Sequence, residues 1–238
     1  MKRLLTTLKE KWPEYLLEII VLVVGIYGAF ALDSWNEHRK NASEEQQMLR
    51  LLYDDFQNSK IQSERLIDRE SEEIQTLVAA LGTKAQVDSL FNATDDHHTA
   101  RTIFWAYRAG VPVFSSFEDF KSSGKIGIIQ SPEIRFELTK LEQKIHALIG
   151  GTNSRTDTHR LLIDAGVVED LNYLPLIIDE RINLAEGQST DYRGLLTRQK
   201  IRNLIGIKLQ MAINILQSRK ELNDQIIEVL AAIEKEIE

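Results

Sequence analysis

Residues of the types that bind metal ions stand next to one another in the tetrad Asp95-Asp96-His97-His98. Carboxylates and imidazoles are zinc ligands, but a closed site takes about four of them in a tetrahedral arrangement. Neighbouring residues on an extended chain point in opposite directions, so the tetrad alone cannot enclose an ion. Two further histidines, His146 and His159, lie far away in the sequence. The sequence therefore predicts a solvated loop here, with no metal ion and no other cofactor.

Nucleophilic residues are also present, in the pairs Ser115-Ser116 and Ser122-Ser123. A serine becomes a catalytic nucleophile only beside a general base, and no His–Asp arrangement adjoins either pair. The sequence also lacks a glycine-rich loop that could hold a phosphate. The aromatic residues of 104–108 form either a binding surface or part of a core, and their position on a predicted short helix favours the core. We therefore expect a protein that is not an enzyme.

The most unusual single side chain is that of Glu18, because it stands in the apolar run of residues 16–32. An ionisable group at the centre of a membrane helix costs about 2.5–3.5 kcal/mol on insertion scales, so such a residue is a functional candidate. Glu18 lies only one turn from the end of the run, where its carboxylate can reach back to the interface, towards Lys11 or water. Alternatively, it pairs with a cation or a hydrogen-bond donor on another membrane helix. Proton transport is the least favoured interpretation, because a single carboxylate offers no relay.

Small residues follow in the same run. Gly25 and Ala29 form a small-xxx-small pair, with Gly28 and Ala31 nearby. Small residues let two helices approach closely in lipid, but glycine and alanine are also common in membrane helices generally. The candidate interface of the membrane helix therefore comprises Glu18, Gly25, Gly28 and Ala29.

The run itself has the composition of a single membrane-spanning helix. Residues 16–32 cover about 25 Å as a helix, slightly less than the ~30 Å hydrocarbon core of a bilayer. Trp12 and Tyr15 at one end and Trp35 at the other suit the two membrane interfaces, and Pro13 suits the first turn of a helix. The sequence thus predicts a short basic leader over 1–13, a transmembrane helix over 14–35 and an extracytoplasmic helical domain over 36–238.

Charge sets the predicted orientation. The leader carries Lys2, Arg3, Lys9 and Lys11 against Glu10, whereas residues 33–40 mix both signs. An excess of lysine and arginine marks the cytoplasmic side, so we expect a cytoplasmic N-terminus, a bacterial inner-membrane anchor and a periplasmic domain. A cleaved signal peptide is the alternative, because Ala29-Phe30-Ala31 imitates a cleavage site. Glu18 and Trp35 favour the uncleaved anchor.

The remainder of the chain is acidic and rich in helix-forming residues. The 238 residues carry a net charge of −7, although the leader is basic. This balance excludes nucleic acid as the expected partner, because its binding needs a basic surface. The chain has no cysteine, which rules out disulfides and thiolate metal sites. Only four prolines and twelve glycines interrupt a composition that favours helices.

Two long amphipathic helices are predicted, one near each end of the domain. The first covers about 43–81, stops at Gly82 and can continue the membrane helix without a break. The second covers about 192–237 and is capped by Thr190 or Asp191. Apolar positions recur every three or four residues, at Leu49, Leu52, Phe56, Leu66, Ile67, Ile74, Leu77, Val78 and Leu81 in the first helix and at Ile201, Leu204, Lys208, Met211, Ile215, Leu222, Ile226, Val229 and Ile233 in the second. Such stripes favour antiparallel pairing within an all-α helical bundle.

Shorter helices are predicted between the two long ones, over about 87–91, 99–109, 116–122, 131–149, 153–165 and 170–185. Ser131-Pro132-Glu133 has the composition of a helix start, with a cap, a proline and an acidic first turn. Gly124 follows Ser122-Ser123 and can adopt a positive φ, which turns the chain and directs Ile126, Ile128 and Ile129 inwards. Its predicted role is structural.

Two blocks of sequence resemble a known family. The first holds Glu18-Ile19, Leu22-Val23-Val24-Gly25-Ile26, Ala31-Leu32, Trp35-Asn36-Glu37 and Arg39-Lys40, and the second is FEDFKSSGKIGIIQSPEIRFEL at 117–138. Together they are similar to a family of small, uncharacterised bacterial single-pass membrane proteins of unknown function. The chain departs from that family at Leu17, where glycine is common, and at Asp33-Ser34, where amides are. The resemblance implies a membrane-anchored exported domain and no activity.

These features predict a non-enzymatic interaction or scaffold protein. It would self-associate in the membrane or serve as an accessory subunit of a larger membrane complex. The alternative is an extracytoplasmic ligand-sensing bundle that signals through a partner, because the leader is too short to carry an output domain.

Overall fold

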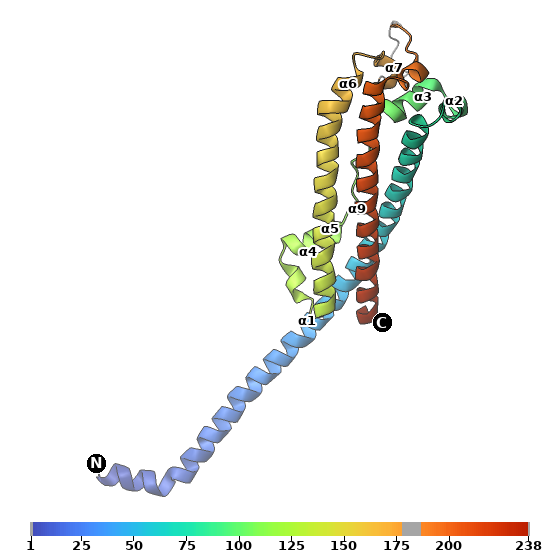
Figure 1. Cartoon of the computed structure of the whole chain (residues 1–238). Coiled ribbons are helices and arrows are strands. Elements are labelled where there is room, and N and C mark those ends of the chain that lie inside the picture. The colour runs from blue at the N-terminus through green and yellow to red at the C-terminus, as the bar shows by residue number, and fades with distance from the viewer. Residues whose placement is uncertain (1, 178–186, 238) are drawn as a thin grey trace.

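The computed structural model describes residues 2–177 and 187–237, and for residues 2–11, 13–15 and 177 it describes the backbone alone. Every regular element in these ranges is a helix, which confirms the all-α prediction. The longest is α1 (Lys2–Ala80), which contains the apolar run and continues without a break into the bundle. Because the helix begins at Lys2, Pro13 lies in its interior, not in its first turn as predicted. Figure 1 shows α1 bending near its N-terminal end.

The predicted antiparallel pairing of the two long helices is confirmed. α9 (Gln199–Ile237) runs back along the part of α1 that follows the apolar run. At one end, Nε2 of Gln46 donates to the carbonyl oxygen of Glu236 at 2.8 Å. At the other end, Nη2 of Arg202 donates to the carbonyl oxygen of Leu81 at 2.8 Å. The C-terminus therefore lies near the point where α1 enters the bundle.

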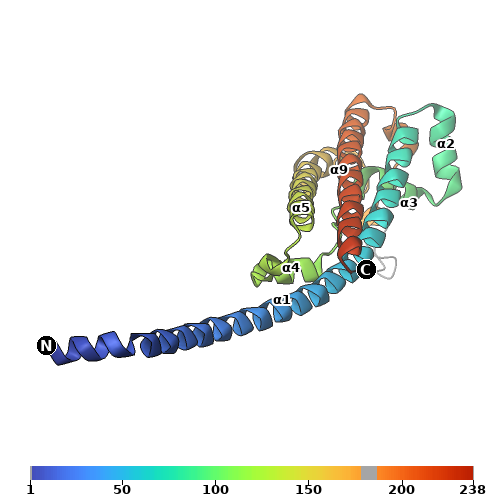
Figure 2. The ribbon, with the colours of Figure 1, turned by 90° about the horizontal axis from the view of Figure 1, so that it is seen from below.

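A third helix, α5 (Pro132–Thr158), completes the bundle, and α9 lies between it and α1 (Figures 1 and 2). Ser131 caps α5 as predicted, by accepting from the backbone N–H of Ile134. The predicted end at Gly150-Gly151 is wrong, because α5 passes through both glycines. A Cβ at Gly151 would meet the side chain of Ile215 at 3.0 Å, so this glycine allows α5 and α9 to pack closely.

The apolar interior is divided into two clusters along the bundle. The cluster near the apolar run is formed by residues such as Leu49, Leu52, Phe56, Leu141, Leu148, Leu222, Ile226 and Ile233. The cluster at the far end is formed by residues such as Leu77, Phe91, Ile103, Phe104, Leu171, Leu195, Ile201 and Leu204. Polar side chains occupy the layer between them, where all three long helices pass.

Short helices close the far end of the bundle. They are α2 (Lys84–Ala93), α3 (Asp96–Ala100), the π-helices η1 (Arg101–Trp105) and η3 (His159–Asp164), α6 (Ala165–Val167), α7 (Leu174–Ile177) and α8 (Tyr192–Leu195). The helix predicted over 99–109 ends early, because the chain leaves η1 at Trp105 and has no helical structure over 106–114. The last predicted helix is divided into α8 and α9, and Asp191 caps α8. Of the helix predicted over 170–185, α7 covers Leu174–Ile177, and residues 178–186 lie outside the described ranges.

The turn predicted at Gly124 is confirmed. α4 (Ser115–Ser122) ends before it and the 3₁₀ turn η2 (Lys125–Ile128) follows. Gly124 has φ = 73°, and no other described residue has a positive φ. After the turn, Ile129 is fully buried in the apolar cluster near the apolar run, and Ile126 packs against that cluster.

Candidate functional site

The apolar run of α1 packs against no other part of the chain within residues 2–177 and 187–237. Its large side chains between Leu16 and Leu32 are 43% to 73% exposed, and every side chain from 16 to 43 is exposed. The segment is long and apolar enough to cross a membrane. Trp12 and Trp35 are exposed as well and are separated by about 35 Å of helix, which matches a bilayer core with its interfaces. The side chain of Tyr15 lies outside the described ones.

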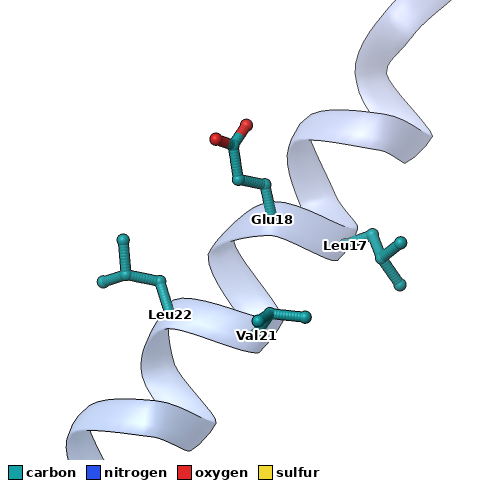
Figure 3. A pocket seen from close by; sticks show the side chains of 4 residues that line it. All are labelled: Leu17, Glu18, Val21 and Leu22. Atoms are coloured by element: carbon teal, nitrogen blue, oxygen red, sulfur yellow. The ribbon is translucent and has the colours of Figure 1, made fainter.

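Glu18 projects from this bare helix without a partner among the side chains that the structure describes. Figure 3 shows Glu18 and Leu22 projecting to one side of the helix and Leu17 and Val21 to the other. No described residue donates a hydrogen bond to the carboxylate or forms an ion pair with it. The four side chains outline only a shallow surface notch, because nothing in the chain covers them.

The small residues of the run share the side of α1 that carries Glu18. At 100° per residue, Glu18, Gly25, Gly28 and Ala29 fall within an arc of about 100°. A Cβ added at Gly25 or Gly28 would meet no atom within 4 Å. The close approach that glycine permits is therefore not used inside the chain and stays available to another helix.

A cluster of five buried charged residues fills the polar layer of the bundle. We call it the central ion cluster; its members are Glu70 and Glu73 on α1, Arg155 on α5, and Lys208 and Arg219 on α9. Each is at most 5% exposed. Buried charges are strongly unfavourable unless they are paired and hydrogen-bonded, so these five residues must be interpreted together.

Arg155 joins α5 to α1 within this cluster. Its Nη1 donates to Oε1 of Glu70 at 2.6 Å, and its Nη2 donates to Oε1 of Glu73 at 2.8 Å. Nε of Arg219 donates to the second oxygen of Glu70 at 3.2 Å. Nζ of Lys208 lies 3.7 Å from Oε1 of Glu73. Three cations thus surround two carboxylates, and all three long helices are tied together.

The cations also hold the non-helical segment 106–114, which we call the strap. Successive carbonyls of an extended chain point to opposite sides, so alternate residues can present theirs to the core. Nζ of Lys208 donates to the carbonyl oxygen of Ala106. Nη1 of Arg155 donates to that of Arg108 at 3.3 Å, and Nη1 of Arg219 donates to that of Gly110 at 2.8 Å. Further along, Oγ of Ser59 donates to the carbonyl of Val113 at 2.6 Å. The carbonyl oxygens of the strap therefore accept hydrogen bonds from the three cations, in addition to those that the two carboxylates accept.

Lys208 has a further role at the end of η1. Its ammonium group also donates to the carbonyls of Thr102 at 2.8 Å and Ile103 at 3.1 Å. A cation is favourable at the C-terminal end of a helix, where carbonyls lack helical partners. Burial lowers the pKa of Lys208 to about 8, and Glu73 opposes that shift. The side chain therefore stays protonated at neutral pH, as its carbonyl acceptors require.

His159 lies beside the central ion cluster on η3 and is 1% exposed. Its ring stacks on Tyr107 of the strap at a centroid distance of 4.2 Å and meets Trp105 edge-on at 6.2 Å. Oδ1 of Asp164 lies 2.8 Å from Nδ1, but the contact lacks the alignment of a hydrogen bond, and neither ring nitrogen has a described hydrogen-bond partner. Burial, together with Lys208, lowers the pKa of His159 to about 3, so the ring is neutral at neutral pH.

Burial also shifts the pKa values of other groups in this region. Burial raises the pKa of Glu70, against the opposing effect of Arg155. Burial also raises the pKa of Asp164 and of Tyr173, and it lowers the pKa of Arg219. Desolvation is therefore the leading cause of the pKa shift for each of these groups.

A solvent-accessible hollow of about 360 Å³ opens in front of the central ion cluster. Its walls come from α1, from the α2–α3–η1 region and from the start of the strap. Glu72, Glu73, Thr76, His98, Thr102 and Arg108 are among the residues that line it. A concave site of this size with convergent polar groups is the usual form of a small-molecule site.

The tetrad Asp95-Asp96-His97-His98 is solvated as predicted, with three of its residues exposed, but it forms the cap and first turn of α3 and not a loop. Asp95 caps α3 by accepting from the backbone N–H of His98 at 2.9 Å, and Asp96 pairs with Arg193 at 2.9 Å. Nδ1 of His97 lies 3.0 Å from the hydroxyl of Tyr192. The side chains thus serve separate structural contacts. Among the described residues no group of three potential ligands gathers around a metal position.

The central ion cluster was not predicted, yet the sequence carried a signal for it. The apolar stripe of α9 steps from Ile215 to Leu222, and Arg219 occupies the omitted position. Lys208 was placed in that stripe as a helical position, without a partner. On α1, Glu70 and Glu73 likewise lie in the gap between Ile67 and Ile74. Charged residues at core positions of several helices therefore indicate a shared buried network.

Comparison with protein families gives one match, and it covers more than half of the chain. Residues 18–154 match DUF6090, described as a family of unknown function. The chain belongs to this family. A search of curated proteins and a search of solved structures with this chain each found no match.

The DUF6090 match begins at Glu18 and ends just before Arg155. It therefore includes the candidate interface of the anchor, both carboxylates of the central ion cluster, the hollow and the strap. The three cations of the cluster, at 155, 208 and 219, lie outside the matched residues. The match supports the resemblance to an uncharacterised family that the two sequence blocks indicated.

Proposed function

We propose that this DUF6090 protein is a membrane-anchored interaction protein whose bundle is held outside the cytoplasm of a bacterial cell. α1 would cross the inner membrane over 14–35 with its N-terminus in the cytoplasm. The protein would then self-associate or act as an accessory subunit of a larger membrane complex. The proposal includes no enzymatic step.

One observation carries this proposal: the apolar run of α1 is fully exposed and is the same helix that forms one wall of the bundle. An apolar surface of this extent requires a cover of lipid or protein. The arc of Glu18, Gly25, Gly28 and Ala29 offers a second helix both a hydrogen-bonding group and a close approach. These residues therefore support contact with a partner helix in the membrane.

The interaction is tested by extracting the tagged full-length protein in mild detergent and determining its mass and the co-purifying chains. Defined assemblies, with itself or with another membrane protein, are expected. Gly25→Leu should weaken the assembly, and Glu18→Gln should weaken it if the carboxylate accepts from the partner. Val23→Leu, on the opposite side of α1, is the matched control. A monomer without partners in several detergents would contradict the proposal.

Topology has its own test, because the chain has no cysteine. Thr6→Cys and Ser154→Cys each introduce a single thiol, on the two sides of the proposed anchor. A membrane-impermeant maleimide should label the Ser154→Cys protein in spheroplasts and the Thr6→Cys protein only after lysis. The reverse labelling pattern would indicate the opposite orientation. Labelling of both variants without lysis would contradict the proposal that α1 crosses the membrane.

A second candidate function is an extracytoplasmic sensor that signals through a partner. The hollow in front of the central ion cluster is the observation that favours it. Because the hollow contacts α1 directly, a ligand there would lie against the helix that forms the proposed anchor.

A further inference from the structure

The strongest unassigned feature outside the anchor is the hollow, because its charges are arranged in an unusual way. Glu72 lies on α1 and Arg108 on the strap, and both are exposed residues that line the hollow. They do not form an ion pair with each other, and neither forms one with any other residue that the structure describes. Water solvates both groups in the absence of a ligand, and each charge stays available to a group of opposite sign that enters the hollow.

The inner wall adds a buried group to these two. Glu73 is 5% exposed and lines the hollow from the side of the central ion cluster. Its Oε1 accepts from Arg155 and faces Lys208, whereas no described residue donates to Oε2. Oε2 is not among the fully buried polar atoms that lack a partner, so it is accessible from the hollow and can accept from a ligand that brings an N–H group. The acidic side of the hollow is thus formed by the unpaired charge of Glu72, and Glu73, whose charge is balanced by Arg155 and Lys208, adds a hydrogen-bond acceptor.

From this geometry we infer that the hollow binds a zwitterion of the α-amino acid type, with its ammonium group towards Glu72 and Glu73 and its carboxylate towards Arg108. A dicarboxylate would meet like charges at the acidic side, and a diamine would meet a like charge at Arg108. The volume of about 360 Å³ accommodates a free amino acid with a side chain. The inference deepens the sensor candidate and does not depend on assembly in the membrane.

The hydroxyls of Thr76 and Thr102 are not free to replace these charges. Oγ1 of Thr76 donates to the carbonyl of Glu72, and Oγ1 of Thr102 donates to that of His98. Each hydroxyl keeps lone pairs that can accept from a ligand, but its single proton is used. Charge complementarity at Glu72, Glu73 and Arg108 is therefore expected to supply most of the affinity.

The test uses full-length protein in detergent and the standard L-amino acids as probes, each at about 10 mM. At least one should raise the midpoint of thermal unfolding, since a ligand that binds only the folded state stabilises it. Titration calorimetry then gives its Kd. Acetate and methylammonium, which carry one charge each, should bind at least about tenfold more weakly.

Two variants locate the site without disturbing the central ion cluster. Glu72→Gln and Arg108→Gln should each weaken binding of the same amino acid about tenfold or more, because each removes a charge-assisted contact. Glu228→Gln and Arg65→Gln, exposed changes of the same kind elsewhere, should leave Kd unchanged. Binding by no amino acid, or binding that survives both site variants, overturns the inference. Neither result affects the assembly test, which uses no ligand.

Discussion

The neutral, buried ring of His159 leads to a sharp prediction about pH. In the unfolded chain a histidine takes up a proton as the pH falls through about 6.5, whereas burial lowers the pKa of His159 to about 3 in the folded protein. Between these values the unfolded state binds more protons than the folded state. The free energy of unfolding therefore falls as the pH falls, and His159→Gln should remove this contribution.

The size of the effect follows from the two pKa values. One pKa unit corresponds to about 1.36 kcal/mol, so between pH 7 and pH 5 the contribution of His159 amounts to about 2 kcal/mol. Other buried groups contribute with their own signs; the raised pKa of Glu70, for example, stabilises the folded state as the pH falls. The quantity to compare is therefore the change from pH 7 to pH 5 in the natural protein minus that in the variant.

The assay is urea-induced unfolding of the full-length protein in detergent, followed by tryptophan fluorescence. Trp105 lies edge-on to His159, and the chain has three tryptophans. Replacing Trp12 and Trp35 with phenylalanine leaves Trp105 as the only reporter. His146→Gln is the matched control, because the side chain of His146 is 68% exposed.

If the free energy of unfolding changed by the same amount from pH 7 to pH 5 in the natural protein and in His159→Gln, the reasoning would be refuted. This result would mean that Asp164, whose Oδ1 lies 2.8 Å from Nδ1 of His159, pairs with a charged imidazole in the folded protein. In that case Asp164→Asn would restore the pH dependence. A difference of the opposite sign would mean that His159 is protonated more readily in the folded state than in the unfolded one.

Three further predictions follow from the bundle. Arg155→Met should lower the free energy of unfolding by about 3–5 kcal/mol, since two buried carboxylates lose their main partner, whereas Arg160→Met on the surface should change it by less than about 0.5 kcal/mol; urea titration checks both. Gly124→Ala should cost about 1–2 kcal/mol because φ is 73°, and Gly127→Ala, with equally open space and no positive φ, should not; equal thermal midpoints for the two variants would contradict this. Ser59→Ala should cost about 1–3 kcal/mol by leaving the carbonyl of Val113 without its donor, and hydrogen exchange should then rise selectively in the strap.

The sequence was sufficient for the elements whose periodicity is regular. The stripes that contain Leu52 and Phe56 on α1 and Ile226 and Ile233 on α9 correctly predicted two long helices in antiparallel contact. The cap at Ser131 and the turn at Gly124 were also predictable, because each depends on a few adjacent residues.

Other elements depend on contacts between distant residues and could not be predicted locally. Gly150-Gly151 has the composition of a helix end, but close packing against Ile215 keeps it helical. The strap over 106–114 is non-helical because buried cations on α5 and α9 take its carbonyls, and those cations follow it in the sequence. The hollow depends on the strap, so it was beyond prediction as well.

The continuity of α1 has a mechanical consequence. From residue 43 to residue 80 the helix extends about 55 Å beyond the exposed run, with no hinge between the proposed anchor and the bundle. A tilt of the anchor by about 5° would therefore displace the far end of the bundle by about 5 Å. Conversely, a ligand that repositions the hollow would exert torque on the apolar run of α1. If that run is the membrane anchor proposed above, the unbroken helix is a lever with one arm in the lipid and the other in the bundle.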